Sequence, residues 1–301
     1  RNQLVAGTAW LFASIEADQS LDYLFVDEAG QTSLANLVAM GTSARNLVLL
    51  GDPMQLGQPL QGSHPEPSGL SALEYVLQGH ATVPLHLGVL LERTYRMHPA
   101  ICGFISDVVY EGRLKASSET ALQVITLPSN QTISLPKAGI VFDAIEHSGC
   151  SQTSEQEAKR IRDLIDLLVT GSYTDTKGMT YPISPANIMV VAPYNAQVKC
   201  IKQFVEESVK VGTVDRFQGQ EAEIVIISMT TSSGEDMPRD ISFLLDKRRL
   251  NVAISRAKSL AIVVSSSDLM NLHCSNPEQM SMVNNIASVE TWSSRQTNER
   301  Q

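Results

Sequence analysis

Residues 248–265 read RRLNVAISRAKSLAIVVS, and this stretch indicates the fold. Its second half is a short apolar run rich in β-branched residues, of the kind that forms a buried strand in a parallel sheet. Its first half contains Arg249 and Arg256, seven positions apart. A guanidinium group is planar and permanently charged, so it can hold a phosphoryl group. The stretch therefore predicts an α/β domain with phosphate chemistry beside one strand, although its first half alone would equally fit a basic surface helix.

Similar apolar runs recur along the chain and predict the other strands. They alternate with helical patterns, which is the arrangement of an α/β fold built on a parallel sheet. The predicted strands are Tyr23–Val26, Leu47–Leu50, Ile140–Ile145, Ile188–Ala192, Ile224–Met229 and Leu260–Ser265.

Two helices and one long loop are predicted between these strands. The clearest helical pattern is Glu155–Thr170, where Ser154 and Glu157 have the spacing of a capping box and apolar residues line one face. A second helix is predicted over 196–208. The stretch Ser172–Pro185 is predicted to be a loop that connects helix to strand.

Length and composition describe an ordinary soluble globular chain. Its 301 residues are enough for about two domains, and it contains no apolar run of about 18 residues that would predict a membrane span. The net charge of -9 argues against nucleic-acid binding by bulk electrostatics, but it leaves room for a narrow groove that holds a strand by backbone amides and stacking. The cysteines are scattered (Cys102, Cys150, Cys200 and Cys274), which disfavours a zinc or iron–sulfur site and indicates reduced thiols of the cytoplasm, or of the nucleus in a eukaryote.

Two predicted strands end in polar residues suited to nucleotide chemistry. Asp27 and Glu28 follow the first strand, as in a Walker B element in which one carboxylate holds Mg²⁺ and the next orients or deprotonates water. Asp52 and Gln55 follow the second strand, and the Gln55 amide can both donate to and accept from a phosphate. Taken singly, these motifs would also fit a solvated strand end and a simple turn.

Five motifs occur in a fixed order along most of residues 5–265. They are DEAGQ (27–31), GDPMQL (51–56), YRMHP (95–99) with Phe104 and YEG (110–112), GTVDRFQGQE (212–221) and RLNVAISRA (249–257). In this order they resemble motifs II, III, IV, V and VI of superfamily 1 helicases. The resemblance is closest to the Upf-like group, which includes RNA-surveillance helicases and nuclease-fused DNA helicases.

The resemblance implies two RecA-like (P-loop NTPase) domains, with ATP in the cleft between them and single-stranded nucleic acid across the top. On this basis residues 1–90 are the C-terminal part of the first domain and residues 91–275 are the second. Residues 276–301 form a polar tail, for which partial helix and disorder both fit.

The resemblance also implies roles at the ATP site. Asp27 would bind Mg²⁺, Glu28 would activate the attacking water and Gln55 would contact the γ-phosphate. Arg96 and Arg256 would reach the γ-phosphate from the second domain. Further residues that the motifs place at the nucleotide are Asp52, Tyr95, Gln218, Gly219, Glu221 and Arg249, of which Tyr95 would stack near the base and Glu221 would hold the ribose or couple the domains.

The resemblance also places four residues where family members contact the single-stranded nucleic acid: Thr8, Pro193, Tyr194 and Thr213. Thr8 would also fit a plain polar loop, and Tyr194 a core aromatic. The resemblance implies 5′-to-3′ movement. It leaves DNA and RNA open as substrates, and we expect DNA first.

The chain departs from the family in one respect. A helicase of this type needs a P-loop, GxxxxGK[ST], and these 301 residues contain no Gly-Lys dipeptide. We expect this loop upstream of Arg1, so that the chain by itself binds ATP very weakly and hydrolyses none. The alternative is a non-hydrolysing relative that acts as a strand-binding or interaction module with a vestigial ATP site.

A nuclease is the other alternative that the sequence raises. Asp143 followed by Glu157-Ala158-Lys159 imitates the carboxylate–lysine pattern of metal-dependent nucleases. Against this interpretation, Glu157 has a role as a capping-box residue, and the triplet begins a helix instead of ending a strand.

Overall fold

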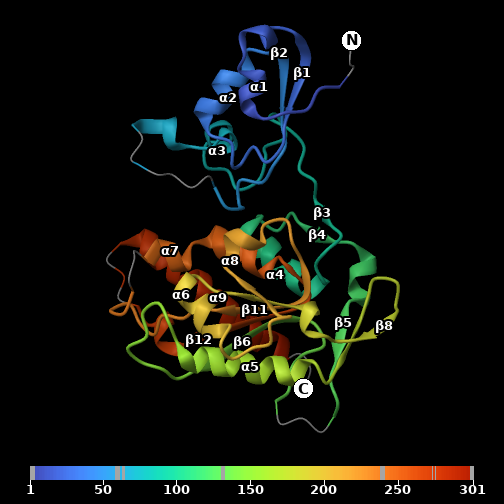
Figure 1. Ribbon diagram of the computed structural model, residues 1–301, viewed down its shortest axis with the longest axis vertical. Helices are drawn as coiled ribbons and strands as arrows, with labels where there is room; N and C mark the ends of the chain where they lie inside the picture. The colour runs from blue at the N-terminus through green and yellow to red at the C-terminus, as the bar shows by residue number, and fades with distance from the viewer. Residues whose placement is uncertain are drawn as a thin grey trace. The chain divides into compact units, whose positions relative to one another are not determined.

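The computed structural model describes residues 4–298 except 58–61, 63–64, 130–132, 238–240, 273 and 275. Two compact units make up the chain, Arg1–Leu90 and Leu91–Gln301 (Figure 1). Each unit is described by itself. Within the described residues, no helix is both long and apolar enough to cross a lipid bilayer.

The first unit is built on two parallel strands, β1 (Leu21–Val26) and β2 (Ala44–Leu49). Side chains alternate along β1, so that Leu24 and Val26 are buried whereas Tyr23 and Phe25 are exposed. The buried side packs against three helices, which are α1 (Ala9–Phe12), α2 (Leu34–Gly41) and α3 (Ala72–Leu77). Short 3₁₀ turns, Ile15–Ala17 and Glu66–Gly69, connect these elements.

The second unit contains a five-stranded parallel sheet, as the sequence predicts. Its order is β10 (Lys210–Gly212), β9 (Ile188–Val191), β11 (Ala222–Ser228), β12 (Ala257–Ser266) and β6 (Gly139–Ile145). Nearly every residue of the three central strands is buried, because helices cover both faces of the sheet. The α/β fold class is therefore confirmed. The longer helices are α4 (Pro99–Val109), α5 (Glu155–Leu168), α6 (Asn195–Ile201), α8 (Lys247–Ile254) and α9 (Pro277–Asn298).

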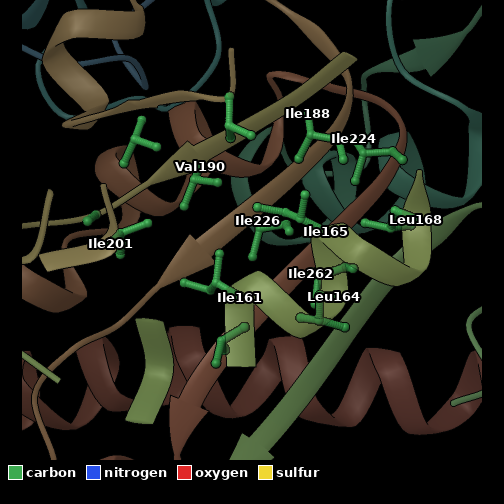
Figure 2. Close-up of a cluster of buried hydrophobic side chains, with 14 of the residues drawn as sticks. Ile161, Leu164, Ile165, Leu168, Ile188, Val190, Ile201, Ile224, Ile226 and Ile262 are labelled. Atoms are coloured by element: carbon green, nitrogen blue, oxygen red, sulfur yellow. The ribbon is translucent and has the colours of Figure 1, made fainter. Parts of the chain in front are cut away.

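One face of this sheet packs against α5 and α6. Figure 2 shows Ile161, Leu164 and Ile165 of α5 against alternate residues of the strands, such as Ile226 and Ile262. These residues are almost entirely buried, and each contributes roughly 1.5–3 kcal/mol by leaving water. The apolar periodicity that predicts α5 is thus the contact surface that holds it on the sheet.

Two predicted connections differ from the structure. The helix predicted over 196–208 ends at Ile201, because Gln203 and Phe204 donate to carbonyls three residues back and turn the chain toward β10. The loop predicted over Ser172–Pro185 instead forms a hairpin of β7 (Ser172–Thr174) and β8 (Thr180–Pro182), which pairs with β5 (Val124–Thr126). At the hairpin turn the Asp175 carboxylate accepts two backbone N–H groups, and cross-strand tyrosines pair beyond it.

The polar tail contains a helix, α9, that protects an edge of the sheet. The backbone N–H of Ile140 donates to Gln296 at 3.2 Å, and that of Phe142 donates to Ser293 at 3.0 Å. Both donors belong to β6, the last strand of the sheet, and among the described residues no strand pairs with its outer side. Trp292 anchors the helix by its ring contact with Phe104. Polar residues of α9 therefore replace a neighbouring strand as hydrogen-bond partners.

Candidate functional site

The acids of the first unit lie at the carboxyl ends of its two strands. Beyond the strands the ladder continues, since the Ala29 N–H donates to the Leu50 carbonyl at 2.8 Å. The two following loops touch: a Cβ placed on Gly30 would lie 2.7 Å from the carbonyl oxygen of Asp52. Only glycine permits this approach without a shift of the backbone. The loop that carries Asp27 is thereby held against the loop that carries Asp52.

Asp27 and Glu28 are both exposed at this edge. Asp27 accepts the backbone N–H of Glu28 at 2.9 Å, and Glu28 itself has a φ of 51°, in the left-handed region. Such a conformation costs on the order of 1–3 kcal/mol in a non-glycine residue and is concentrated at functional sites. It turns the chain at the end of β1, where the two carboxylates follow each other.

The donor set fits Mg²⁺ bound together with a phosphate. Within the described part of the chain, no group of three or more His, Cys, Asp or Glu residues is arranged to hold a metal by itself. Mg²⁺ does not require such a cage, because it keeps several waters and binds one or two carboxylates plus substrate phosphates. Asp27 offers a carboxylate of this kind.

Asp52 positions Gln55 in the neighbouring loop. The Gln55 side-chain amide donates to one Asp52 oxygen at 3.0 Å, while the other accepts the Met54 N–H at 2.9 Å. The remaining capacity of the Gln55 amide suits a phosphate oxygen or a water.

In the second unit, Arg96 is held in a short segment before α4. The His98 N–H donates to the Lys258 carbonyl at 2.8 Å, which fixes the segment to the start of β12. Gln123 donates to the Arg96 carbonyl at 2.7 Å. Tyr95, the preceding residue, is 67 % exposed and presents its ring to solvent.

The Arg96 guanidinium is paired with Glu221. Its Nε lies 2.8 Å from the carboxylate, and its Nη1 donates to the Ser255 carbonyl at 3.3 Å. Lys258 bridges Glu221 and Glu223, with 3.2 Å to each. Burial by itself would raise the pKa of Glu221, but hydrogen bonds from Arg96 and Lys258 outweigh it and hold that pKa below its ordinary value. The acid is therefore ionised at neutral pH.

Arg256 joins the same group from the end of α8. It is only 3 % exposed, and its Nη1 donates to the Gln220 carbonyl at 3.2 Å. Gln218 and Gly219 form the turn just before, where Gly219 has a φ of +75° that favours glycine. We call Arg96, Arg256, Glu221 and Lys258 the arginine cluster. Its residues belong to motifs IV, V and VI or directly follow motif VI, and Arg96 precedes the other three by more than a hundred positions.

Arg249 does not join the arginine cluster. It lies near the start of α8, whereas Arg256 follows the end of that helix at Ile254, and the helix rises about 7.5 Å between Arg249 and Ile254. Its guanidinium carbon is 4.5 Å from the Phe243 ring centroid, and its Nη1 is 3.3 Å from the Asp215 carboxylate. Phe243 in turn stacks on Tyr194 at 5.6 Å with the rings 24° apart. We call Tyr194, Phe243 and Arg249 the aromatic stack.

The residues predicted to contact single-stranded nucleic acid do not form one group in the structure. Tyr194 is 5 % exposed, which agrees with the core-aromatic alternative and leaves little ring surface for a base. Pro193 and Thr213 are half-buried, and Thr213 precedes the 3₁₀ turn Val214–Phe217. Thr8 is exposed in the first unit, where it precedes α1. Contact of these residues with a strand stays a prediction.

The sequence did not predict a buried polar network around Glu157. The capping-box prediction is half right: Ser154 accepts the Glu157 N–H at 3.1 Å, but the Ser154 N–H donates to Gln197. The Glu157 carboxylate is fully buried instead, accepting from the Ser228 hydroxyl and lying 3.1 Å from His147 Nε2. The polar Ser228, which ends the apolar run Ile224–Ile227 of β11, is the feature of the sequence that could have indicated this network.

Glu157 also compensates for a strained residue. Thr230 has a φ of 70°, although it is β-branched, and its N–H donates to both Glu157 oxygens at 2.9 Å. Asp143, the other acid of the nuclease-like pattern, pairs instead with Arg160 at 2.7 Å and 2.9 Å. The two carboxylates therefore serve separate structural contacts.

We expect Glu157→Ala to destabilise the second unit by about 3 kcal/mol, because it leaves buried partners and the Thr230 N–H unsatisfied. Glu155→Ala, an exposed acid on the same helix, should change stability by less than about 0.5 kcal/mol. Trp292 fluorescence in a Trp10→Phe background during urea unfolding would report on the second unit. Equal stability of the two variants, or metal-dependent strand cleavage lost only in Glu157→Ala, would contradict a structural role.

Comparison with known proteins identifies the family. A family described as an AAA domain matches residues 71–268, which is most of the second unit and the end of the first. The chain is a member of the Upf1-like superfamily 1 helicases. The family resemblance of the five motifs is thus confirmed, and the second unit is its RecA-like domain.

Two curated relatives illustrate the similarity. The chain is 32 % identical to the putative helicase mov-10-B.1 of Danio rerio, over 81 % of this chain and 27 % of that protein. It is 29 % identical to the DNA polymerase alpha-associated DNA helicase A of Schizosaccharomyces pombe, over 83 % of this chain and 38 % of that protein. The chain spans well under half of these relatives.

Solved structures of helicases are also similar. One example is Arterivirus nonstructural protein 10, a helicase in complex with DNA. The match covers 80 % of this chain and 39 % of that protein, with 17 % identity and a TM-score of 0.40.

Proposed function

We propose that this chain is the part of an ATP-dependent nucleic-acid helicase or translocase that carries motifs II to VI. The observation that carries the proposal is the arginine cluster, in which Arg96 pairs with Glu221 and Arg256 donates to the carbonyl of the preceding residue, Gln220. Family membership supports the same conclusion. A buried or half-buried arginine that a carboxylate or carbonyl keeps in place is preorganised for a phosphoryl group, which is the stronger anionic partner.

The first unit supplies the other half of the chemistry. Asp27 would hold Mg²⁺ with its water shell, and Glu28 would orient or deprotonate the attacking water. Gln55, held by Asp52, would contact the γ-phosphate. When bound, the metal neutralises charge that develops on the transferred phosphoryl group. ATP and Mg²⁺ are thus the proposed ligands.

In the second unit, Arg96 and Arg256 would contact the γ-phosphate. The exposed ring of Tyr95 would stack on the base of the nucleotide. Once Arg96 is released, Glu221 would bind the ribose or couple the two domains. Lys258 would keep the Glu221 carboxylate ionised.

The proposed substrate is single-stranded nucleic acid, with DNA first and RNA as the alternative, and the proposed direction is 5′ to 3′. The relatives' names include both a DNA helicase and an RNA helicase, so both polymers belong in the test. We propose a cytoplasmic location, or a nuclear one in a eukaryote, which fractionation would check.

The test compares the full-length protein with residues 1–301 in one ATPase assay, with and without single-stranded DNA or RNA. We expect the full-length protein to hydrolyse ATP faster when a strand is added, and residues 1–301 to hydrolyse none, because they contain no P-loop motif. Strand binding by the full-length protein without any hydrolysis would favour the non-hydrolysing binding module instead. Robust hydrolysis by residues 1–301 would show that the assignment of the motifs is wrong.

A further inference from the structure

Two groups of the second unit lie at opposite edges of its parallel sheet. Glu221 and Arg256 immediately precede β11 and β12, so the arginine cluster is at the edge where these strands begin. Tyr194 and Asp215 follow β9 and β10 closely, so the aromatic stack is at the edge where strands end. Arg249, at the start of α8, belongs to the second edge by its contacts with Phe243 and Asp215.

We propose that Arg249 binds a phosphate of the single-stranded nucleic acid, and not the triphosphate of the nucleotide. This inference rests on the proposed function, because it names one strand contact of the same machine. The separate placement of Arg249 and Arg256 is its first support: Arg256 is held by the Gln220 carbonyl just before β11, whereas Arg249 is held by Phe243 and Asp215 at the edge where the strands end.

The local geometry suits a phosphate of a polymer backbone. The Arg249 guanidinium carbon lies over the Phe243 ring, 4.5 Å from its centroid, and this cation–π contact restrains the group beside the Asp215 carboxylate. Thr213, two residues before Asp215, lies at the end of β10 and offers a hydroxyl at the same edge. Ligands of open α/β sheets bind outside the carboxyl ends of the strands, which is this edge.

The present partner of Arg249 is easily exchanged. The Asp215 side chain is 58 % exposed and that of Arg249 is 27 % exposed, with 3.3 Å between them. An ion pair in such contact with solvent contributes about 0–1 kcal/mol and weakens with salt. A phosphate can accept two parallel N–H groups of the guanidinium, which is a stronger and more directional contact. Asp215 therefore holds Arg249 in place until a strand phosphate replaces it.

The test uses the full-length protein and labelled oligonucleotides of about 12 nucleotides, dT and rU, with anisotropy measured over a series of salt concentrations. We expect Arg249→Ala to weaken binding about tenfold and to lower the salt slope by about 0.7, the value for one lost phosphate contact on a single strand. Arg249→Lys should fall between, since it keeps the charge but loses the planar stack. The KM for ATP should stay within about twofold of the unmodified protein, because no nucleotide contact is lost.

Arg162→Ala is the matched control, because it removes one exposed positive charge from α5 and should leave affinity and salt slope unchanged. Thermal unfolding checks that each variant is folded, and Arg249→Lys carries the test if the alanine variant is not. An increased KM for ATP with unchanged strand binding would overturn the inference and return Arg249 to the nucleotide site. Absence of strand binding by the unmodified protein would count against the proposed function itself.

Discussion

Replacing Arg256 with alanine in the full-length protein is expected to lower the rate of ATP hydrolysis by about 10³–10⁵-fold, equivalent to about 4–7 kcal/mol of barrier. The reason is electrostatic: a guanidinium aimed at the transferred phosphoryl group stabilises charge that appears only in the transition state. The effect should appear in kcat under saturating ATP and strand. Strand affinity without nucleotide should change little.

Arg256 is almost fully buried, so the alanine variant needs a check on folding. Arg256→Lys retains a charge near the Gln220 carbonyl and should fold, yet it lacks the planar fork and should still lose most activity. Arg295→Ala, an exposed change on α9, serves as the control for loss of one positive charge. Hydrolysis within about tenfold of the unmodified rate in a folded variant would contradict the role of Arg256.

Glu28→Gln is expected to lower ATP turnover by about 10²–10⁴-fold, because the amide cannot accept a proton from the attacking water. The amide is nearly isosteric, and the backbone of Glu28 stays in its left-handed conformation, so the loop should be preserved. ATP binding and strand binding should therefore persist, which steady-state kinetics and anisotropy would separate.

Glu16→Gln removes an exposed acid from the 3₁₀ turn of the same unit and should leave turnover unchanged. A similar small effect of Glu28→Gln, or loss of ATP binding in place of turnover, would show that Glu28 does not act on water.

The sequence predicted most of the central sheet because its strands are buried on both faces. A strand such as β11 must be apolar at nearly every position, and such a run is visible without any structure. Short strands gave no comparable signal, as with β10, which has three residues and lies at the edge. The helix α9 was left open because polar residues such as Ser293 and Gln296 are used there to satisfy the edge of β6.

The residues of the site were predicted better than their arrangement. The order of the motifs predicted that Arg96, Glu221 and Arg256 belong to one site. Only the fold shows that Arg96 is hydrogen-bonded to Glu221, which lies 125 positions away in the sequence. The seven-residue spacing of Arg249 and Arg256 suggested that both belong to one site. In the structure α8 lies between them, and the two arginines have different partners. Phe243, which orients Arg249, has no motif of its own that would mark it.

We propose that arginines of the second unit complete the ATP site whose acids belong to the first unit. The most direct measurement is a structure of the full-length protein with Mg²⁺, ADP and a phosphoryl-transfer analogue such as aluminium fluoride. We predict that the guanidinium groups of Arg96 and Arg256 lie within about 3.2 Å of the analogue, with Arg96 released from Glu221. An analogue bound at Asp27, with Arg96 still held by Glu221 and Arg256 still held by the Gln220 carbonyl, would show that these arginines do not complete the ATP site.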